Sequence, residues 1–194
     1  MKSLRKEDIK QEVFDLYDAY AHNKLERRDF VQKLSMYAVG GITVPSLMSF
    51  LMPDYESTFI VDKNNPDLDS SFITYNSTKG GGEIKALLSK PKSAIDKLPG
   101  IVVVHENRGL NPYVEDTARR AALADFITIA PDALSPLGGY PGNDDKGREM
   151  QRTRDRNEML EDFIAAFEYL KSHKDCNGKI GVVGFCFGGW ISNM

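Results

Sequence analysis

The chain has 194 residues, of which 41% are hydrophobic and 27% are charged, and its formal net charge is −3. These values fit a soluble protein with one main core, and nothing in the slightly acidic charge balance favours a general affinity for nucleic acid. The two cysteines, Cys176 and Cys186, are too few for a disulfide framework, and the strand predicted between them separates them beyond disulfide reach.

Residues 1–53 are predicted to form a helical N-terminal extension. Apolar residues recur there at helical spacing, namely Ile9, Val13, Phe14, Leu16, Tyr17 and Tyr20. Arg27 and Arg28 follow, and residues 34–53 carry no charge. Twin arginines before an uncharged stretch are typical of a bacterial twin-arginine export signal.

Two readings of this extension remain open. An export signal that works predicts a periplasmic or exported protein. An ordinary amphipathic helix that ends at Gly40 and Gly41 predicts a cytoplasmic one. In either case glycines, serines and Pro45 make residues 34–53 too polar and too broken for a stable membrane span.

Residues 54–70 are polar and acidic and are predicted to be a linker. The segment from Asp62 to Pro66 superficially resembles a calcium-binding loop. However, such a loop needs glycine at its sixth position and a carboxylate at its twelfth, where this chain has Asp67 and Ile73. We therefore expect no metal site here.

Residues 71–194 carry an α/β pattern. Phe72 to Tyr75 and Glu83 to Leu88 flank three glycines, 80–82, and predict a β-hairpin. The predicted elements that follow are a strand at 100–104, a helix at 115–125, a strand at 126–130, a loop at 132–142, one helix of about 25 residues ending at His173, and a strand at 179–183. This order predicts a mostly parallel sheet flanked by helices.

The densest basic cluster lies within the long predicted helix. It consists of Arg148, Arg152, Arg154 and Arg156, interleaved with Glu149, Asp155 and Glu158. Alternating charges at helical spacing are typical of a solvated helix face, so we expect no nucleic-acid site.

The last predicted strand runs into Gly184-Phe185-Cys186-Phe187-Gly188, a nucleophile-elbow pattern with cysteine in the serine position. The elbow is a sharp strand-to-helix turn that strains its central residue, and the flanking glycines remove Cβ atoms that would collide. The alternative is a buried structural cysteine, because a free cysteine behaves as a small hydrophobic residue.

The loop after the strand at 100–104 contains the other candidate residues. In an α/β-hydrolase this loop supplies one oxyanion-hole N–H, and the residue after the nucleophile supplies the other. The backbone N–H groups of Asn107 and Phe187 are therefore the candidate donors. Glu106 is placed to accept the thiol proton, and its alternative is a loop carboxylate in solvent.

Three phrases resemble the dienelactone hydrolase family: residues 105–113 (HENRGLNPY), residues 130–142 (APDALSPLGGYPG) and residues 184–189 (GFCFGG). The resemblance extends to a branch with a twin-arginine extension. It implies an α/β-hydrolase fold and cofactor-free hydrolysis of lactones or small esters by a Cys-His-Asp triad. By motif, Cys186 corresponds to the nucleophile and Glu106 to the glutamate that pairs with it before substrate arrives.

The resemblance also places the triad Asp and His after the nucleophile, where this sequence has neither. His22, His105 and His173 are not at the matching position. We therefore expect an incomplete α/β-hydrolase fold, truncated and with little or no activity. The alternative is a non-enzymatic remnant or binding fragment, or one half of a split hydrolase. The last strand would then be an apolar edge through which copies of the chain associate.

Overall fold

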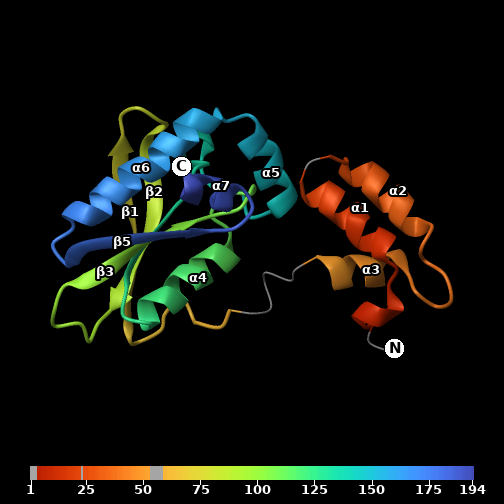
Figure 1. Ribbon diagram of the computed structural model, residues 1–194, viewed down its shortest axis with the longest axis horizontal. Coiled ribbons are helices and arrows are strands. Elements are labelled where there is room, and N and C mark those ends of the chain that lie inside the picture. Colours follow the sequence, from red (N-terminus) through yellow and green to blue (C-terminus); the bar gives the residue numbers. More distant parts are fainter. Residues whose placement is uncertain (1–3, 23, 53–58) are drawn as a thin grey trace. The chain divides into compact units, whose positions relative to one another are not determined.

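The computed structural model describes residues 4–22, 24–52 and 59–194, and the chain divides into two compact units, Met1–Ser57 and Thr58–Met194 (Figure 1). The first unit contains a 3₁₀ turn η1 (Lys6–Asp8) and the helices α1 (Gln11–Ala21), α2 (Arg27–Ser35) and α3 (Val44–Leu51).

The apolar residues of the extension form a small core of their own. Phe30 and Leu34 are completely buried, and the Phe30 ring stacks on Tyr20 with ring centroids 4.6 Å apart. Thr43 begins α3 with a side-chain hydrogen bond from the Ser46 N–H. Arg27 and Arg28 form the first turn of α2. None of the helices in the described part of the chain has the length and apolar character needed to cross a membrane.

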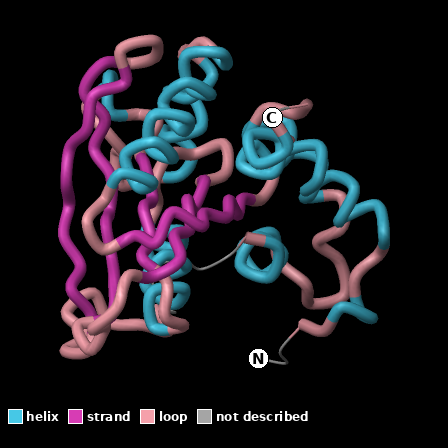
Figure 2. The backbone as a smooth tube through the Cα atoms, turned by 60° about the vertical axis from the view of Figure 1, so that its left-hand side comes forward, coloured by secondary structure: helices cyan, strands magenta, loops and turns pink. Residues whose placement is uncertain are grey.

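The second unit is a five-stranded sheet with helices on both faces. Its strands are β1 (Leu68–Ser77), β2 (Gly82–Pro91), β3 (Leu98–Val104), β4 (Ile127–Pro131) and β5 (Cys176–Gly184). Its helices are α4 (Pro112–Leu123), the 3₁₀ turn η2 (Ser135–Leu137), α5 (Asp144–Arg152), α6 (Arg156–Ser172) and α7 (Phe187–Asn193). Figure 2 shows the strands in magenta among the cyan helices.

The strand order is β1-β2-β4-β3-β5, and the sheet is mixed. β3 runs parallel to β4 and β5, whereas β2 runs antiparallel to β1 and β4. Of the described strands, β1, β3, β4 and β5 therefore run in one direction and only β2 runs against them, which confirms the expectation of a mostly parallel sheet. The hairpin at residues 68–91 is joined directly to the parallel strands, and a short hairpin turn can connect only antiparallel neighbours.

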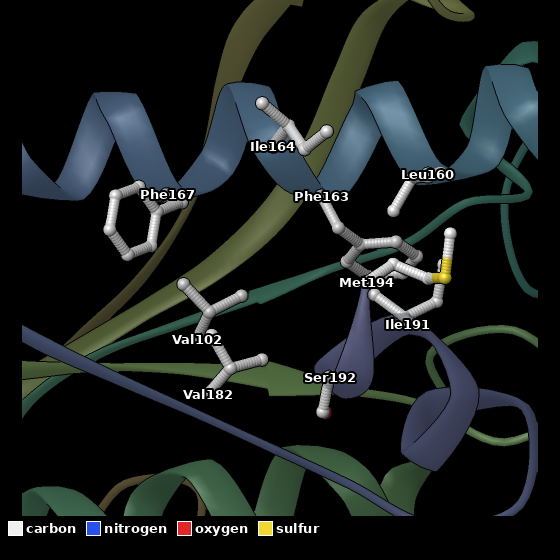
Figure 3. Close-up of a pocket in the computed structure, with 9 residues that line it drawn as sticks. All are labelled: Val102, Leu160, Phe163, Ile164, Phe167, Val182, Ile191, Ser192 and Met194. Atoms are coloured by element: carbon white, nitrogen blue, oxygen red, sulfur yellow. The ribbon is translucent and has the colours of Figure 1, made fainter.

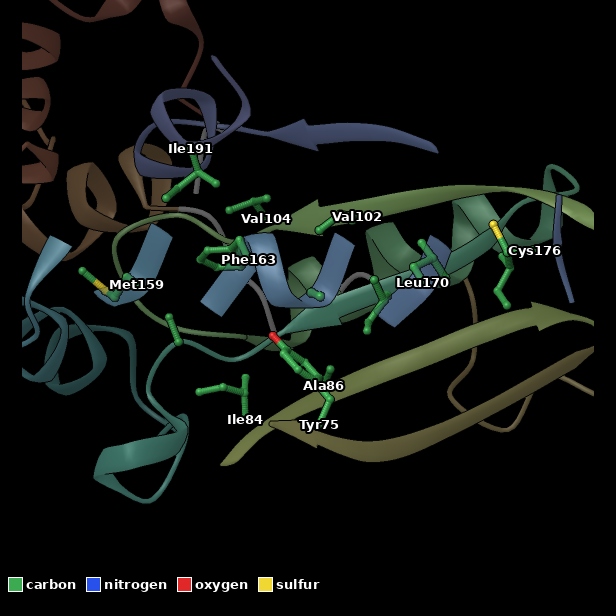
Figure 4. Close-up of a cluster of buried hydrophobic side chains, with 14 residues drawn as sticks. Tyr75, Ile84, Ala86, Val102, Val104, Met159, Phe163, Leu170, Cys176 and Ile191 are labelled. Atoms are coloured by element: carbon green, nitrogen blue, oxygen red, sulfur yellow. The ribbon is translucent and has the colours of Figure 1, made fainter. Parts of the chain in front are cut away.

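The alternation of side chains along β3 explains the two helical layers. Val102 and Val104 belong to the core cluster that contains Phe163 and Leu170 of α6 (Figure 4), whereas Val103 packs with Val114 and Ala118 of α4. Because successive residues of a strand face opposite sides, a continuous apolar strand buries both faces of the sheet.

The predicted linker and the long predicted helix differ in the structure. Leu68 to Ser70, placed in the predicted linker, begin β1. Val61, also in that segment, is buried, and its N–H donates to Asp116 Oδ1 at 2.8 Å. The long helix is two helices, because Asp155 caps α6 by accepting from the N–H groups of Asn157 and Glu158 and so ends the continuous helical ladder.

Two of the clustered arginines are buried, which corrects the prediction of a solvated helix face. Arg148 is 4% exposed and Arg154 is 8% exposed, whereas Arg152 and Arg156 are exposed. Arg154 turns into the protein because the break between α5 and α6 directs it to the Ala133 carbonyl and the Asp162 carboxylate. The same carboxylate accepts from the Gly81 N–H at 2.7 Å, which accounts for the close approach of the hairpin turn.

Candidate active site

Cys186 lies at the sharp turn between β5 and α7, with φ 56° and ψ −117°. A positive φ is unusual for a residue with a Cβ and stores backbone strain, so it persists only where the surrounding structure imposes it. The residue is exposed, and of the two cysteines only Cys176 is buried. This backbone conformation fits the predicted elbow and does not fit a buried structural cysteine.

The glycines around the elbow are required by close backbone packing. A Cβ added to Gly188 would lie 2.5 Å from the Val104 carbonyl oxygen and 2.9 Å from that of His105. A Cβ on Gly184 would lie 2.5 Å from the Gly188 backbone. The start of α7 therefore sits directly against the end of β3, and this contact positions the elbow beside the loop that follows β3.

The register of the sheet brings the two candidate loops together. Val104 of β3 pairs with Gly184 of the neighbouring parallel strand β5. Consequently the loop that carries Glu106 and Asn107 and the turn that carries Cys186 and Phe187 leave the same edge of the sheet from adjacent strands. Ligand sites of open α/β sheets form at this carboxyl edge.

His105 is completely buried, and its ring bonds to two backbone groups. Its Nε2 accepts from the Ala133 N–H at 3.1 Å, so its Nδ1 carries the proton and donates to the Glu106 carbonyl oxygen at 2.6 Å. Its ring stacks on that of Phe187 with centroids 6.1 Å apart. Burial lowers the pKa of His105, against the opposing influence of Asp132 and the bond to Glu106. Both ring nitrogens are engaged by backbone groups, and the side chain does not face solvent as a general base would.

Glu106 is half-buried at the start of the loop. Burial raises the pKa of its carboxyl group, Arg108 opposes this effect, and Asp144 adds to it. Arg108 itself pairs with Asp144 at 3.2 Å, and the Tyr140 hydroxyl donates to the same carboxylate at 2.7 Å. Glu106 therefore combines a carboxyl group that holds a proton more readily than usual with a position on the loop beside the elbow.

Two residues that support the loop were missed from the sequence. Asp132 accepts backbone N–H groups from Leu110, Leu134 and Tyr140 at 3.2, 3.0 and 2.7 Å. Gln151 of α5 bonds to the loop at both ends. A polar residue directly after a buried strand is a usable signal for Asp132. No comparable signal marks Gln151 in the sequence, because a neutral side chain within a charged helix has no distinctive pattern.

His173 lies apart from the elbow. His173 caps α6 and precedes β5, whose nine residues span roughly 30 Å at about 3.3 Å per residue, and Cys186 follows the opposite end of that strand. Within the described residues there is no group of three or more His, Cys, Asp or Glu side chains that could hold a metal ion.

Two cavities lie next to these elements, and neither is lined by Cys186 or Glu106. One, of about 180 Å³, is an apolar groove between α6, β3, β5 and α7 (Figure 3). The other, of about 560 Å³, is an open depression between the loop after β4 and α5.

Comparisons with known proteins agree with this geometry. Residues 84–194 match the model of the Dienelactone hydrolase family, and residues 1–40 match a family described as YqhI-like. The chain is 51% identical over 114 residues to the hydrolase fragment YghX of Escherichia coli K12, covering 59% of this chain and 97% of that one. It is 33% identical over 123 residues to the carboxymethylenebutenolidase of Pseudomonas sp. strain P51, covering 59% of this chain and 50% of that enzyme.

The solved structures show the same fold. One named m3DLH aligns with a TM-score of 0.53 and 23% identity over 66% of this chain and 53% of that chain. The dienelactone hydrolase-like promiscuous phosphotriesterase P91 aligns with a TM-score of 0.52 and 22% identity over the same shares. The chain thus spans about half the length of these proteins and has the α/β-hydrolase arrangement of their matching half. Because the family model covers more than half of the sequence, the chain belongs to the dienelactone hydrolase family.

Proposed function

We propose that this chain carries the nucleophile and the oxyanion hole of a dienelactone hydrolase-like enzyme for lactones or small carboxylic esters. We further propose that the 194-residue chain alone has little or no activity, because none of the residues after Cys186 is the Asp or the His that the resemblance implies for the triad. The observation that carries the proposal is the strained backbone of Cys186, with φ 56°, at a strand-to-helix turn. Strain at an exposed residue of this kind is typical of a catalytic nucleophile.

The proposed chemistry begins with attack of the Cys186 sulfur on the substrate carbonyl carbon. As the S–C bond forms, the C=O π electrons move to the oxygen, and the N–H groups of Asn107 and Phe187 stabilise the developing charge. The oxyanion then collapses and breaks the ester C–O bond, which leaves a thioester on Cys186. The proton of the thiol passes through Glu106 to the leaving oxygen.

The second half-reaction consumes one water molecule. The water oxygen bonds to the thioester carbon, the C–S bond breaks, and one proton of the water returns to the sulfur. This step needs a general base to be fast. His105 cannot serve because both ring nitrogens are bonded to the backbone, and His173 lies at the other end of β5. Glu106 is a weaker base than an imidazole and supports this step only slowly, so we expect acylation with little or no turnover.

Stoichiometric acylation tests this proposal. The chain is mixed with p-nitrophenyl acetate, released nitrophenolate is followed, and the acetyl group is located by mass spectrometry. We expect close to one equivalent of acetyl on Cys186 and a faster reaction than in the urea-denatured chain. Acylation of Cys186 at the same rate in the folded and the denatured chain would contradict the proposed oxyanion hole.

A second function is favoured by a different observation, the apolar surface next to β5. Among the described residues β5 pairs with β3 alone, and Val182 and Ile164 beside the groove are 41% and 45% exposed. Such a surface suits a non-enzymatic binding fragment or one half of a split hydrolase.

Co-production with the second half of the Pseudomonas sp. enzyme separates these functions. Esterase activity that depends on Cys186 supports a split hydrolase, and stable association without activity supports a binding fragment. If neither is observed, the second function is rejected and the first stands.

We also propose that the location of the protein depends on the twin arginines. It is periplasmic or exported if the signal works, and otherwise cytoplasmic. Fractionation of producing cells tests this, with Arg27→Lys and Arg28→Lys combined as the control. Export that is unchanged by the double substitution would contradict a twin-arginine signal.

A further inference from the structure

We infer that Gln151, together with His105, is a positioning residue that sets the direction of the Asn107 N–H in the oxyanion hole. This inference rests on the proposed function, and it assigns a catalytic consequence to a buried glutamine on a helix that contributes no reacting group.

The first step concerns the carbonyl group of Glu106. Its oxygen accepts from His105 Nδ1 at 2.6 Å and from Gln151 Nε2 at 3.2 Å. A carbonyl oxygen has two lone pairs, so both are used by fixed side chains. The direction of this C=O bond is therefore set by two elements that belong to different parts of the fold, the end of β3 and α5.

The second step follows from the planarity of the peptide. The Glu106 carbonyl and the Asn107 N–H belong to the same peptide group, and the described part of the chain contains no cis peptide bond. In a trans peptide the C=O and N–H bonds point in opposite directions. Holding the carbonyl oxygen against His105 and Gln151 therefore turns the Asn107 N–H to the opposite side of the loop.

The third step is that Gln151 also holds the far end of the same loop. Its Oε1 accepts from the Gly109 N–H at 2.9 Å. One turn earlier on α5, a Cβ on Gly147 would lie 2.2 Å from the Arg108 carbonyl oxygen, so the helix backbone lies directly against the loop. One side-chain amide thus bonds residues 106 and 109, on either side of the proposed oxyanion donor.

His105 connects this arrangement to the nucleophile. Its ring packs edge-on against Phe163 and is stacked on Phe187, the residue that supplies the other proposed N–H. His105 therefore fixes the position of the Glu106 carbonyl relative to the start of α7. This in turn fixes the positions of the two proposed N–H donors, Asn107 and Phe187, relative to each other.

The test compares two reactions of the same sulfur. Acylation of Cys186 by p-nitrophenyl acetate develops an oxyanion, whereas alkylation by iodoacetamide displaces iodide and develops none. Their ratio reports the oxyanion hole and cancels changes in thiol exposure and ionisation. Both rates are measured on the full chain by mass spectrometry of the Cys186 peptide.

Two substitutions separate the two bonds of Gln151. Gln151→Met preserves length and removes both bonds. Gln151→Glu keeps an acceptor for the Gly109 N–H and removes the donor to the Glu106 carbonyl. Glu149→Gln, on the exposed side of α5, is the matched control. Loss of a whole oxyanion donor costs about 10²–10³ in rate, so we expect both Gln151 variants to lower the acylation-to-alkylation ratio about tenfold or more, and the control to leave it within about twofold.

The outcomes distinguish this inference from the function on which it rests. If the acylation-to-alkylation ratio of the wild-type chain equals that of the denatured chain, the proposed oxyanion hole is contradicted, and so is this inference. A raised wild-type ratio that persists in Gln151→Glu would overturn the inference alone. If Gln151→Met lowers both rates in parallel together with the melting temperature, Gln151 only supports the fold and the inference is wrong.

Discussion

Arg154 and Asp162 form an ion pair of 2.9 Å in which the two side chains are 5% and 0% exposed. The arginine comes from the break between α5 and α6 and also bonds to the Ala133 carbonyl, while the carboxylate also bonds to the Gly81 N–H. This buried ion pair thus connects the hairpin, the loop after β4 and helix α6.

Removing Arg154 takes this counter-charge from the buried Asp162, and removing Asp162 leaves Arg154 only the more exposed Glu158 at 3.7 Å. We expect Asp162→Ala and Arg154→Leu each to lower the free energy of unfolding by about 3–5 kcal/mol, and the double variant to lose less than the sum. Urea unfolding of the three variants measures this. Additive losses would show that the two charges do not act as a pair.

Two neighbouring glycines of α7 should respond oppositely to alanine. Gly188→Ala places a Cβ 2.5 Å from the Val104 carbonyl oxygen, and we expect a loss of about 1–3 kcal/mol in stability. In Gly189→Ala the nearest atom is 3.6 Å away, so the better helix propensity of alanine should give a gain of up to about 1 kcal/mol. Thermal melting of both variants measures these changes in stability, and an equal change in the two variants would contradict the packing of α7 against β3.

Hydrolytic turnover by the chain alone should be negligible. Removal of triad residues from a hydrolase lowers the rate by a factor on the order of 10⁴–10⁶. After the first equivalent of product, the purified chain should hydrolyse a chromogenic ester no faster than Cys186→Ala or Cys186→Ser. Sustained turnover that Cys186→Ala abolishes would show that the chain already has a complete catalytic set.

His105 should make stability depend on pH. Burial lowers the pKa of His105 in the folded chain, so below the ordinary value of about 6.5 the unfolded chain takes up a proton that the folded chain does not. Stability should therefore fall as pH drops through about 6.5 and stop falling below the pKa of the folded state.

The contributions of His173 and Glu106 to the pH dependence of stability must be separated from that of His105. The pKa of His173 is also lowered, chiefly by burial, so His173→Gln should remove part of the dependence. The pKa of Glu106 is raised by burial, which stabilises the fold as pH falls, so the series is best measured in Glu106→Gln. Urea midpoints between pH 5 and 8 report the result, and a midpoint independent of pH in Glu106→Gln would contradict the buried neutral imidazole.

The edge of β5 should make the chain associate. Val182 is apolar and 41% exposed beside this edge, and uncovered β-branched edges are templates for further pairing. Light scattering over a dilution series should show oligomers that Val182→Lys reduces. Ile164→Lys, on α6 beside the same groove, is the matched control. An equal effect of both variants would assign the association to the groove rather than the strand edge.

The sequence predicted those parts of the fold whose pattern is local. The apolar runs around Val102 and Ile129, the three glycines of the hairpin and the elbow at Cys186 each carry their own signal in neighbouring residues. The break between α5 and α6 was missed because the helical periodicity continues across it, and the cap formed by the Asp155 side chain is seen only in the structure. The roles proposed for Glu106, Asn107 and Phe187 stay predictions.

The loop after β3 is held by Gln151 at the carbonyl of Glu106 and the amide of Gly109, and the Arg108 side chain adds an ion pair to Asp144. Exchange of the Arg108 side chain would remove the ion pair to Asp144, whereas the two backbone anchors at Glu106 and Gly109 do not depend on that side chain. A variant library at position 108 would therefore change the charge beside Glu106 while Gln151 still holds the loop backbone.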